Sequence, residues 1–333
     1  MYKVALDVMG GDYAPHSTLK GAELALKKFP DLYLLLVGKE SILKSWEGRK
    51  RVSLYYTEET IGMDESPKAA LKEKKEASIF KGIELVKKGL AQAFVSAGNS
   101  GAIVAGAIFI LGRLEGVRRP AIATLMPTLK KPIVLIDAGA NVDSKPFDLL
   151  QFGVMGSVFL EKIWGRKNPK ISLLSIGEES GKGNTLVKKA HELFLNSKLN
   201  YIGNIESKDI FWGETDVVVC DGFIGNICLK LSEGLAEVIL EMLKNEVKNS
   251  FLYLLGMRLA KGALENFKKK ADWREHGGAP LLGVKGNIII AHGRSDAVAI
   301  ENAIKVAMTF IKINLVDRLS KAISEMIKME EKE

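Results

Sequence analysis

Cysteine and histidine are scarce in this chain of 333 residues. It has two cysteines and four histidines, which are Cys220, Cys228, His16, His191, His276 and His292. Two cysteines cannot build a disulfide framework, which favours a reducing compartment. No H-E-x-x-H or C-x-x-C motif is present, so little material is left for a zinc site. We therefore expect neither a metal nor another cofactor.

Long apolar runs are also missing. The longest, Gly101–Gly112, falls short of the ~20 residues that span a bilayer. The N-terminal stretch MYKVALDVMGGD predicts a strand followed by a turn, unlike a signal peptide with its basic start and long apolar region. These two features favour a cytoplasmic protein.

Three familiar active-site signatures are absent as well. The chain contains neither the G-x-G-x-x-G of dinucleotide-binding folds nor the G-x-S-x-G of α/β-hydrolases. Residues 177–183 resemble the phosphate-binding loop of NTPases, but the spacing is G-x-x-x-G-K-G, one residue short. No Ser or Thr follows the lysine to hold magnesium. The sequence therefore argues against a dinucleotide enzyme, an NTPase and a serine hydrolase.

Positive charge is in excess but is not concentrated. The net charge is +8, from 48 Lys and Arg against 40 Asp and Glu, and the lysines are scattered, often beside glutamates. Scattered charge is typical of a solvated surface. Aromatic and basic residues do not interleave as in a base-stacking platform, so we expect no nucleic-acid partner.

Short apolar runs alternate with helical patterns through most of the chain, beginning with the strand pattern at Val4–Val8. This alternation predicts βαβ units and an α/β fold with a mainly parallel sheet. No linker marks a clean boundary, so we treat residues 1–333 as a single catalytic unit. We expect two subdomains within it, residues 1–140 with 283–333, and residues 141–282.

Glycine is modestly over-represented, with 32 residues where an average composition of about 7% would give roughly 23. Fifteen of the 32 lie in six loops that follow predicted strands, at residues 7–12, 96–102, 137–141, 177–184, 221–226 and 277–293. Ligands of open parallel sheets bind beyond the carboxyl ends of the strands. The glycine surplus therefore marks the places where we expect chemistry.

Several of these loops lead directly into a predicted helix. Free N–H groups at a helix N-terminus, with the helix dipole behind them, bind phosphate. Turn and cap chemistry explains any single loop equally well, but six loops of one type favour a binding site. The candidate phosphate- or substrate-binding residues are Asp7, Gly10, Gly11, Asp12, Asn99, Ser100, Gly101, Asn141, Asn184 and His292. Asn99, Asn184 and Asn226 are also candidate helix caps.

Lys182 is the most informative single residue of the six loops. It lies between two glycines ahead of a predicted helix, where a compact positive charge can hold phosphate or neutralise an oxyanion. A solvated surface lysine is the alternative. His292, beside Gly293 at a strand end, is likewise either functional or a core or capping histidine.

Six motifs occur in order: DVMGGDYAP, SAGNSGA, DAGAN, IGEESGKGN, DGFIGNICLK, and GGAPLLGVKG followed by HGRS. In this combination, over nearly the whole chain from Lys3 to Val316, the sequence resembles the PlsX family. Members of this family are acyl-[acyl-carrier-protein]:phosphate acyltransferases of bacterial phospholipid synthesis. The chain departs from the usual pattern at Val8, where alanine is commoner, and at His276, where an aromatic residue is commoner.

The resemblance implies a fold, an activity and two catalytic residues. The implied fold is an α/β/α sandwich similar to isocitrate and isopropylmalate dehydrogenases, dimeric, with a cleft between two subdomains. The implied reaction transfers a long fatty acyl group from acyl carrier protein to inorganic phosphate. Carried over by motif, the catalytic residues are Lys182 of KGN and Asn226 of GFIGN. The partners would be acylated carrier protein and phosphate.

Two other functions remain open at this point. One is a phosphotransacetylase-type acyltransferase that uses acyl-coenzyme A. The other is a non-catalytic regulator that binds phosphate or acyl carrier protein.

The segment Phe251–Lys270 is both apolar and basic, with the sequence FLYLLGMRLAKGALENFKKK. Leu252, Leu255 and Leu259 form one helical stripe, and they are our candidate membrane contacts. One interpretation is a dimer-interface or core helix. The other is a surface helix on anionic lipid, which fits peripheral contact with the inner face of the cell membrane.

Overall fold

The computed structural model of the protein describes residues 1–248, 251–263 and 277–330. In this part of the chain the strands form one 11-stranded sheet of order β3-β2-β1-β4-β11-β10-β5-β6-β9-β7-β8. The strands are β1 Tyr2–Asp7, β2 Leu32–Gly38, β3 Val52–Tyr56, β4 Ala93–Ser96, β5 Ala121–Met126, β6 Ile133–Ile136, β7 Ile171–Ser175, β8 Tyr201–Glu206, β9 Val217–Val219, β10 Ala279–Leu282 and β11 Asn287–Ile290.

The sheet consists of two parallel groups joined by antiparallel strands. In one group β3, β2, β1, β4 and β11 are parallel, and in the other β6, β9, β7 and β8 are parallel. Strands β10 and β5 lie between the groups, and the pairings β11–β10, β10–β5 and β5–β6 are all antiparallel. Three reversals make the two groups run in opposite directions. The mainly parallel α/β sheet that the sequence predicts is confirmed.

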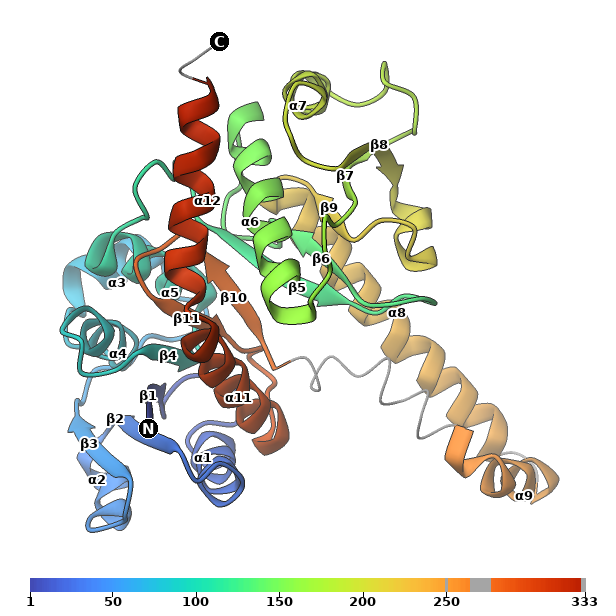
Figure 1. The fold of residues 1–333 in the computed structure, drawn as a ribbon. Helices are drawn as coiled ribbons and strands as arrows, with labels where there is room; N and C mark the ends of the chain where they lie inside the picture. Colours follow the sequence, from blue (N-terminus) through green and yellow to red (C-terminus); the bar gives the residue numbers. More distant parts are fainter. Residues whose placement is uncertain (249–250, 264–276, 331–333) are drawn as a thin grey trace.

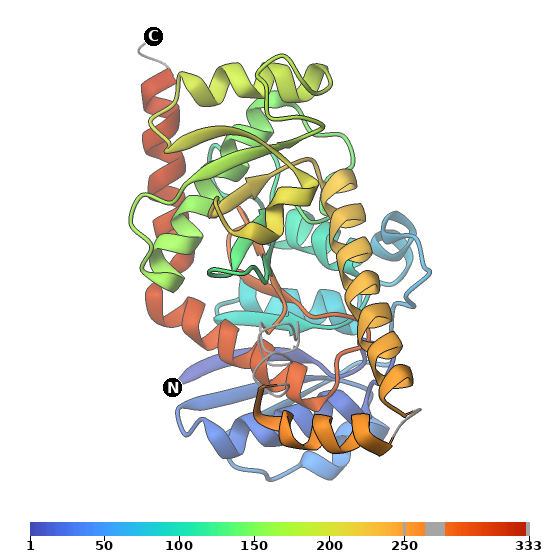
Figure 2. The same cartoon turned by 90° about the vertical axis from the view of Figure 1, so that its right-hand side faces the viewer.

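The helices cover both faces of this sheet (Figures 1 and 2). They are α1 His16–Lys28, α2 Glu40–Leu43, α3 Pro67–Glu73, α4 Ser78–Lys87, α5 Ser100–Gly106, α6 Pro146–Trp164, α7 Thr185–Leu195, α8 Gly222–Lys248, α9 Phe251–Leu259, α11 Ala297–Ile313 and α12 Leu315–Glu330, with the short helical turns η1 Lys44–Trp46, η2 Ala107–Leu111 and η3 Ser207–Trp212.

Alternate side chains of β1 show why both faces need cover. Val4 and Leu6 point into a core shared with α1, α6, α11 and α12, whereas Ala5 points into a core shared with α4 and α5. A strand buried on both faces is apolar at nearly every position. The unbroken run VAL in β1 reflects this, as does LYLLLV in β2. The division into two subdomains at residues 140 and 283 stays a prediction.

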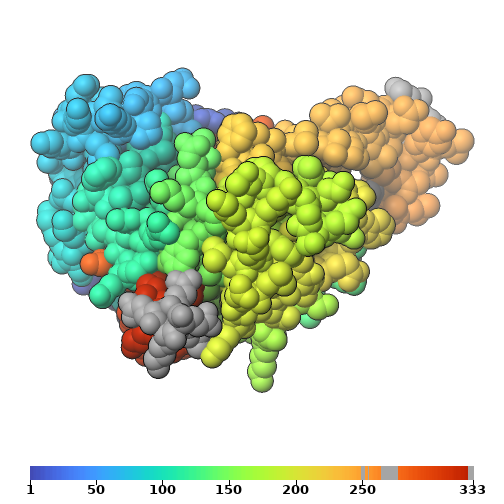
Figure 3. Space-filling model, turned by 90° about the horizontal axis from the view of Figure 1, so that it is seen from above, coloured from blue at the N-terminus to red at the C-terminus, as the bar shows by residue number. Residues whose placement is uncertain are grey.

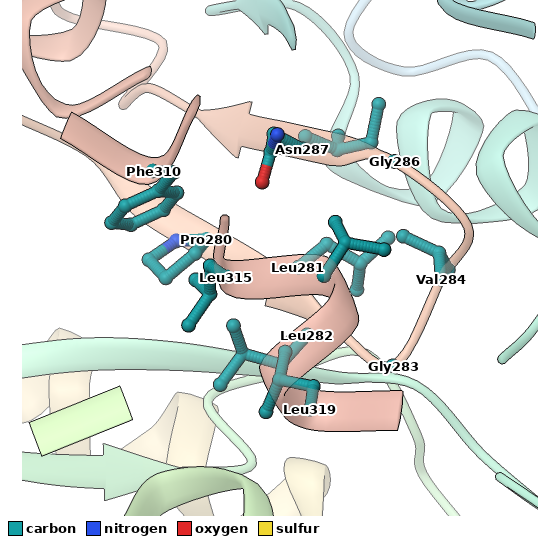
Figure 4. A pocket seen from close by; sticks show the side chains of 12 residues that line it. Pro280, Leu281, Leu282, Gly283, Val284, Gly286, Asn287, Phe310, Leu315 and Leu319 are labelled. Atoms are coloured by element: carbon teal, nitrogen blue, oxygen red, sulfur yellow. The ribbon is translucent and has the colours of Figure 1, made fainter. Parts of the chain in front are cut away.

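The hairpin of β10 and β11 packs under the junction of α11 and α12. Phe310, Leu315 and Leu319 face Pro280 and Leu282 across a narrow pocket (Figure 4). The pocket is lined almost entirely by aliphatic residues and glycine. Its polar side chain, Asn287, donates from Nδ2 to the carbonyl of Gln92. We assign this pocket to core packing.

Helices α8 and α9 form an arm that projects from the body of the molecule (Figures 1 and 3). Gly222 and Gly225 at the start of α8 are buried, and most of its remaining residues are exposed. Within the ranges that the structure describes, no helix is both long and apolar enough to cross a membrane. The segment Phe251–Lys270 is described to residue 263, and the rest of it lies outside the described residues.

Candidate active site

Three of the six glycine-rich loops meet at the ends of β1, β4 and β11. A Cβ on Gly10 would lie 2.6 Å from the backbone nitrogen of Gly98, so the first loop packs tightly on the second. The backbone N–H of Asp12 donates to the carbonyl of Gly293, 2.8 Å away, which joins the first loop to the sixth. Gly11, with φ of +106°, needs the freedom of glycine at this junction.

Asp7 holds the first two loops together. Its carboxylate is fully buried, and it accepts hydrogen bonds from the backbone of Met9 (3.0 Å) and from Oγ of Ser96 (2.7 Å). Burial raises the pKa of Asp7, and these hydrogen bonds oppose the increase. Both carboxylate oxygens therefore have protein partners, which favours an organising role for Asp7 over contact with phosphate.

Asn99 caps α5 and also anchors a neighbouring loop. Its Oδ1 accepts from the backbone of Ala102, and its Nδ2 donates to the carbonyls of Gly62, Met63 and Glu65. The predicted cap is therefore present, and both N–H groups of the amide are already used, so none is left to donate to a phosphate. The next residues, Ser100 and Gly101, are exposed at the helix N-terminus.

A second carboxylate, Asp137, organises the loop after β6. It is completely buried. Its Oδ1 accepts from the backbone N–H groups of Ile122, Gly139 and Ala140, at 2.9–3.1 Å. Its Oδ2 accepts from the backbone and the side-chain nitrogen of Asn141, both at 2.8 Å. Sequence reasoning did not single out Asp137, although an acidic residue directly after a buried strand was the available signal.

Asn141 and the start of α8 complete this second cluster. The Asn141 side chain is buried and donates to Asp137 and to the carbonyl of Pro120, so its amide also organises the loop. A Cβ on Gly225 would overlap the carbonyl oxygen of Asp137, and one on Gly222 would lie 2.5 Å from the carbonyl oxygen of Asn141. Glycine is therefore required where α8 meets the loop.

Asn226 lies inside α8 and does not cap it. The helix begins at Gly222, and Oδ1 of Asp221 accepts from the backbone of Phe223 and Ile224, so the prediction of an Asn226 cap is wrong. The side chain of Asn226 rests against Gly139 and is partly exposed. It has no hydrogen-bond partner among the residues the structure describes. Its amide is therefore available to a substrate.

Lys182 lies in the loop between β7 and α7. Its backbone N–H donates to the carbonyl of Glu179, 2.9 Å away, and its side chain is exposed. A Cβ on Gly177 would lie 2.8 Å from Cγ of Lys182, so the absence of a side chain there lets the lysine fold over the strand end. Asn184 caps α7 by accepting from the backbone of Val187, as predicted.

Strand order places Lys182 and Asn226 at the same edge of the sheet. Strands β6, β9 and β7 are adjacent and parallel, and neighbouring strands lie about 4.8 Å apart. The Asp137 loop, the start of α8 and the Lys182 loop follow these three strands in turn. The side chains of Lys182 and Asn226, which hold no loop in place, therefore both lie beyond the ends of neighbouring strands, β7 and β9.

Helix α8 connects this edge to the sixth loop. Nε2 of His292 lies 3.6 Å from Oε2 of Glu233, and Arg294 pairs with Glu237 at 3.0 Å. Glu233 and Glu237 follow Asn226 by seven and eleven residues, which places all three on one helix face. The distance from Asn226 to Glu233 along the helix axis is about 10 Å. Sequence reasoning missed Glu233, although its helical spacing from Asn226 was a usable signal.

Both cysteine thiols are shielded from solvent to some degree. Burial raises the pKa of both Cys220 and Cys228, which keeps these thiols protonated and weakly nucleophilic. Within the described ranges 1–248, 251–263 and 277–330, no group of three or more His, Cys, Asp or Glu side chains is arranged to hold a metal ion.

The order and direction of the strands can be compared with those of solved structures, which defines the fold class of the protein. The fold is similar to that of a phosphotransacetylase from Streptococcus pyogenes, with a TM-score of 0.58 and 18% identity over 97% of this chain and 94% of the other. It is also similar to a 4-hydroxythreonine-4-phosphate dehydrogenase from Klebsiella pneumoniae, with a TM-score of 0.54 and 13% identity over 93% and 100% of the two chains. The protein thus has the α/β fold that these two enzymes share.

Sequence comparison identifies the family. The model of the family described as "Fatty acid synthesis protein" matches residues 2–318. A protein of Caldanaerobacter subterraneus subsp. tengcongensis named phosphate acyltransferase is 49% identical over 310 residues, which cover 93% of each chain. The chain belongs to this family, as its six motifs predict, and it is an acyltransferase.

Proposed function

We propose that the protein transfers a long-chain fatty acyl group from an acyl-[acyl-carrier-protein] thioester to inorganic phosphate. The product is an acyl phosphate for phospholipid synthesis. The observation that carries this proposal is the position of Lys182 and Asn226 beyond the adjacent parallel strands β7 and β9, with the exposed N-terminus of α7 three residues after Lys182. The name of the relatives, phosphate acyltransferase, supports phosphate as the acceptor.

The proposed reaction needs positioning and charge stabilisation. A phosphate oxygen attacks the thioester carbonyl carbon, the carbon–sulfur bond breaks, and the thiolate takes up the proton that the phosphate releases. Holding phosphate on backbone N–H groups beside the thioester replaces a bimolecular encounter by a positioned one. The carbonyl oxygen becomes negative in the transition state, and the Lys182 ammonium and the Asn226 amide would stabilise it there.

Replacement of the lysine tests the proposal. We expect Lys182→Ala to lower turnover by about 10²–10³-fold, the usual cost of removing one oxyanion donor, with the fold intact. The assay is phosphate-dependent release of free thiol from an acyl carrier protein thioester. Lys189→Ala removes an exposed lysine of α7 and serves as the matched control. Near-normal acyl phosphate formation by Lys182→Ala would refute the assignment.

Phosphotransacetylase activity on acyl-coenzyme A is the second candidate, because the fold is shared with a phosphotransacetylase. Parallel assays with a short acyl-coenzyme A and a long acyl carrier protein thioester separate the two. We expect a kcat/KM at least tenfold higher for the carrier protein thioester. A non-catalytic regulator would release no thiol in either assay and would tolerate loss of Lys182.

We also propose that the protein is a homodimer that contacts the membrane peripherally through its arm. The support for the membrane contact is the exposure of Leu252, Leu255 and Leu259 on α9, which are 73%, 48% and 83% exposed. Flotation with anionic vesicles tests the membrane contact. We expect Leu255→Glu to reduce recovery in the lipid fraction, and equal recovery of both proteins would contradict the membrane contact.

Sedimentation equilibrium tests the dimer. We expect a mass of twice that of the chain, and the mass of a single chain would contradict the dimer.

A further inference from the structure

The loop that carries Lys182 has an unusually permissive backbone. Gly177, Gly181 and Gly183 lie within seven residues, and Gly183 has a φ of +101°. Glycine loses more conformational freedom on ordering than any other residue. An exposed lysine on such a loop therefore needs an anchor from outside the loop if its ammonium is to be held in one place.

Asn204 of β8 supplies this anchor. Its Nδ2 donates to the carbonyl oxygen of Glu179, 3.1 Å away. The backbone N–H of Lys182 donates to the same oxygen from 2.9 Å. One carbonyl thus joins the turn that presents Lys182 to a side chain of the neighbouring strand. Asn204 is only 9% exposed, so the donor side of this hydrogen bond is shielded from competing water, although Glu179 itself is exposed.

A second contact bears on the orientation of the Asn204 amide. With Nδ1 of His191 protonated and donating to the Tyr201 hydroxyl, this hydroxyl donates its own proton to Oδ1 of Asn204, 3.4 Å away, and Nδ2 faces Glu179. The Tyr201 hydroxyl also lies 2.6 Å from Nδ1 of His191, and the ring of Tyr201 packs against Phe194. Burial raises the pKa of Tyr201, so its hydroxyl stays protonated and able to donate.

We propose that Asn204 is a positioning residue for Lys182, acting through the carbonyl of Glu179, with Tyr201 orienting its amide. This inference rests on the proposed acyl transfer to phosphate. Asn204 touches no reacting atom; it restricts where the Lys182 ammonium lies when the oxyanion forms. A misplacement of about 1 Å costs as much as 10²-fold in rate when the displaced group is catalytic.

A double-mutant cycle with Lys182 tests the inference. We expect Asn204→Ala to lower kcat about tenfold, with a smaller change in the KM for acyl carrier protein thioester. In the Lys182→Ala background the same substitution should leave the residual turnover unchanged within twofold, because the group it positions is gone. Asn196→Ala is the matched control, since Asn196 is exposed at the end of α7. It should leave both backgrounds unchanged.

Two further variants separate hydrogen bonding from simple packing. Asn204→Asp keeps the size of the side chain but cannot donate to Glu179, so we expect a loss at least as large as for alanine. Tyr201→Phe removes only the orienting hydroxyl and should cause a smaller loss, again absent in the Lys182→Ala background. If Asn204→Ala does not fold, we compare the effect of Tyr201→Phe on turnover with and without Lys182→Ala. Equal losses in the two backgrounds would then overturn the inference.

Equal losses in both Lys182 backgrounds would overturn the inference, since Asn204 would then act independently of Lys182. Full activity of Asn204→Asp would overturn it as well. Failure of the proposed function is a different result: the unaltered protein would release no thiol in response to phosphate, and the inference would fall with it.

Discussion

Asp137 offers the sharpest test of how the site is built, through the substitution Asp137→Asn. Every hydrogen-bonding partner of this buried carboxylate is an N–H donor, three on Oδ1 and two on Oδ2. An asparagine has one amide oxygen, which can keep one set of donors. Its NH2 group must then face N–H groups in place of an acceptor.

The expected loss in the free energy of unfolding follows from the two N–H donors that bind Oδ2 of Asp137. Two hydrogen bonds to a charged group are lost, and each contributes about 1.5–3 kcal/mol, for a total of about 3–6 kcal/mol. Burial raises the pKa of Asp137, which means that the carboxylate already bears a desolvation cost that the neutral amide avoids. We therefore expect the lower end, about 3 kcal/mol, which for 333 residues corresponds to a decrease in Tm of roughly 4 °C.

Thermal unfolding followed by circular dichroism measures this effect, and the thiol-release assay shows whether turnover falls with it. Asp143→Asn is the control, because Asp143 lies six residues after Asp137 in the same loop but is exposed to solvent. It should change stability by less than about 0.5 kcal/mol. A Tm for Asp137→Asn within 1 °C of the unaltered protein, roughly 0.7 kcal/mol or less, would refute the reasoning from an all-donor environment.

Three more outcomes follow from the same geometry. Gly183→Ala places a Cβ 2.8 Å from Cγ1 of Val187 at a φ of +101°, so we expect kcat/KM to fall at least tenfold. Gly181→Ala, whose Cβ would meet nothing within 4 Å, should stay near normal in the same assay. Cys228→Ser should keep turnover within twofold, since the raised pKa of Cys228 keeps its thiol protonated near neutral pH. We also expect no burst of acyl-enzyme. A tenfold loss of turnover would instead implicate the thiol. Glu233→Gln, which weakens the contact to His292, should raise the KM for the acyl donor several-fold, and an unchanged KM would show that the Glu233–His292 contact plays no part in binding this donor.

Local features of the site could be predicted from the sequence because their contacts are local. The caps formed by Asn99 and Asn184 bond to N–H groups three residues ahead, so a short segment contains both partners. Alternation of apolar runs with helical patterns likewise predicts the α/β class, since each strand and helix shows its own periodicity. The cap of α8 is predicted at Asn226, four residues after the true start, because closely spaced glycines such as Gly222 and Gly225 are typical of turns. In the structure, Gly222 and Gly225 are instead the small residues that let a helix approach the Asp137 loop.

The sequence by itself determined the family, the strand-end position of the loops and the identity of Lys182 and Asn226 as the residues to test. Only the tertiary structure decided which polar groups remain available. It placed Asp7, Asn99 and Asn141 in loop-holding hydrogen bonds, and it brought Asn204 to Glu179 across 25 residues and Arg294 to Glu237 across 57. The physical reason is that strand order sets these partners. The order β6-β9-β7-β8 arises from packing of the whole sheet, and no local periodicity encodes which strands become neighbours.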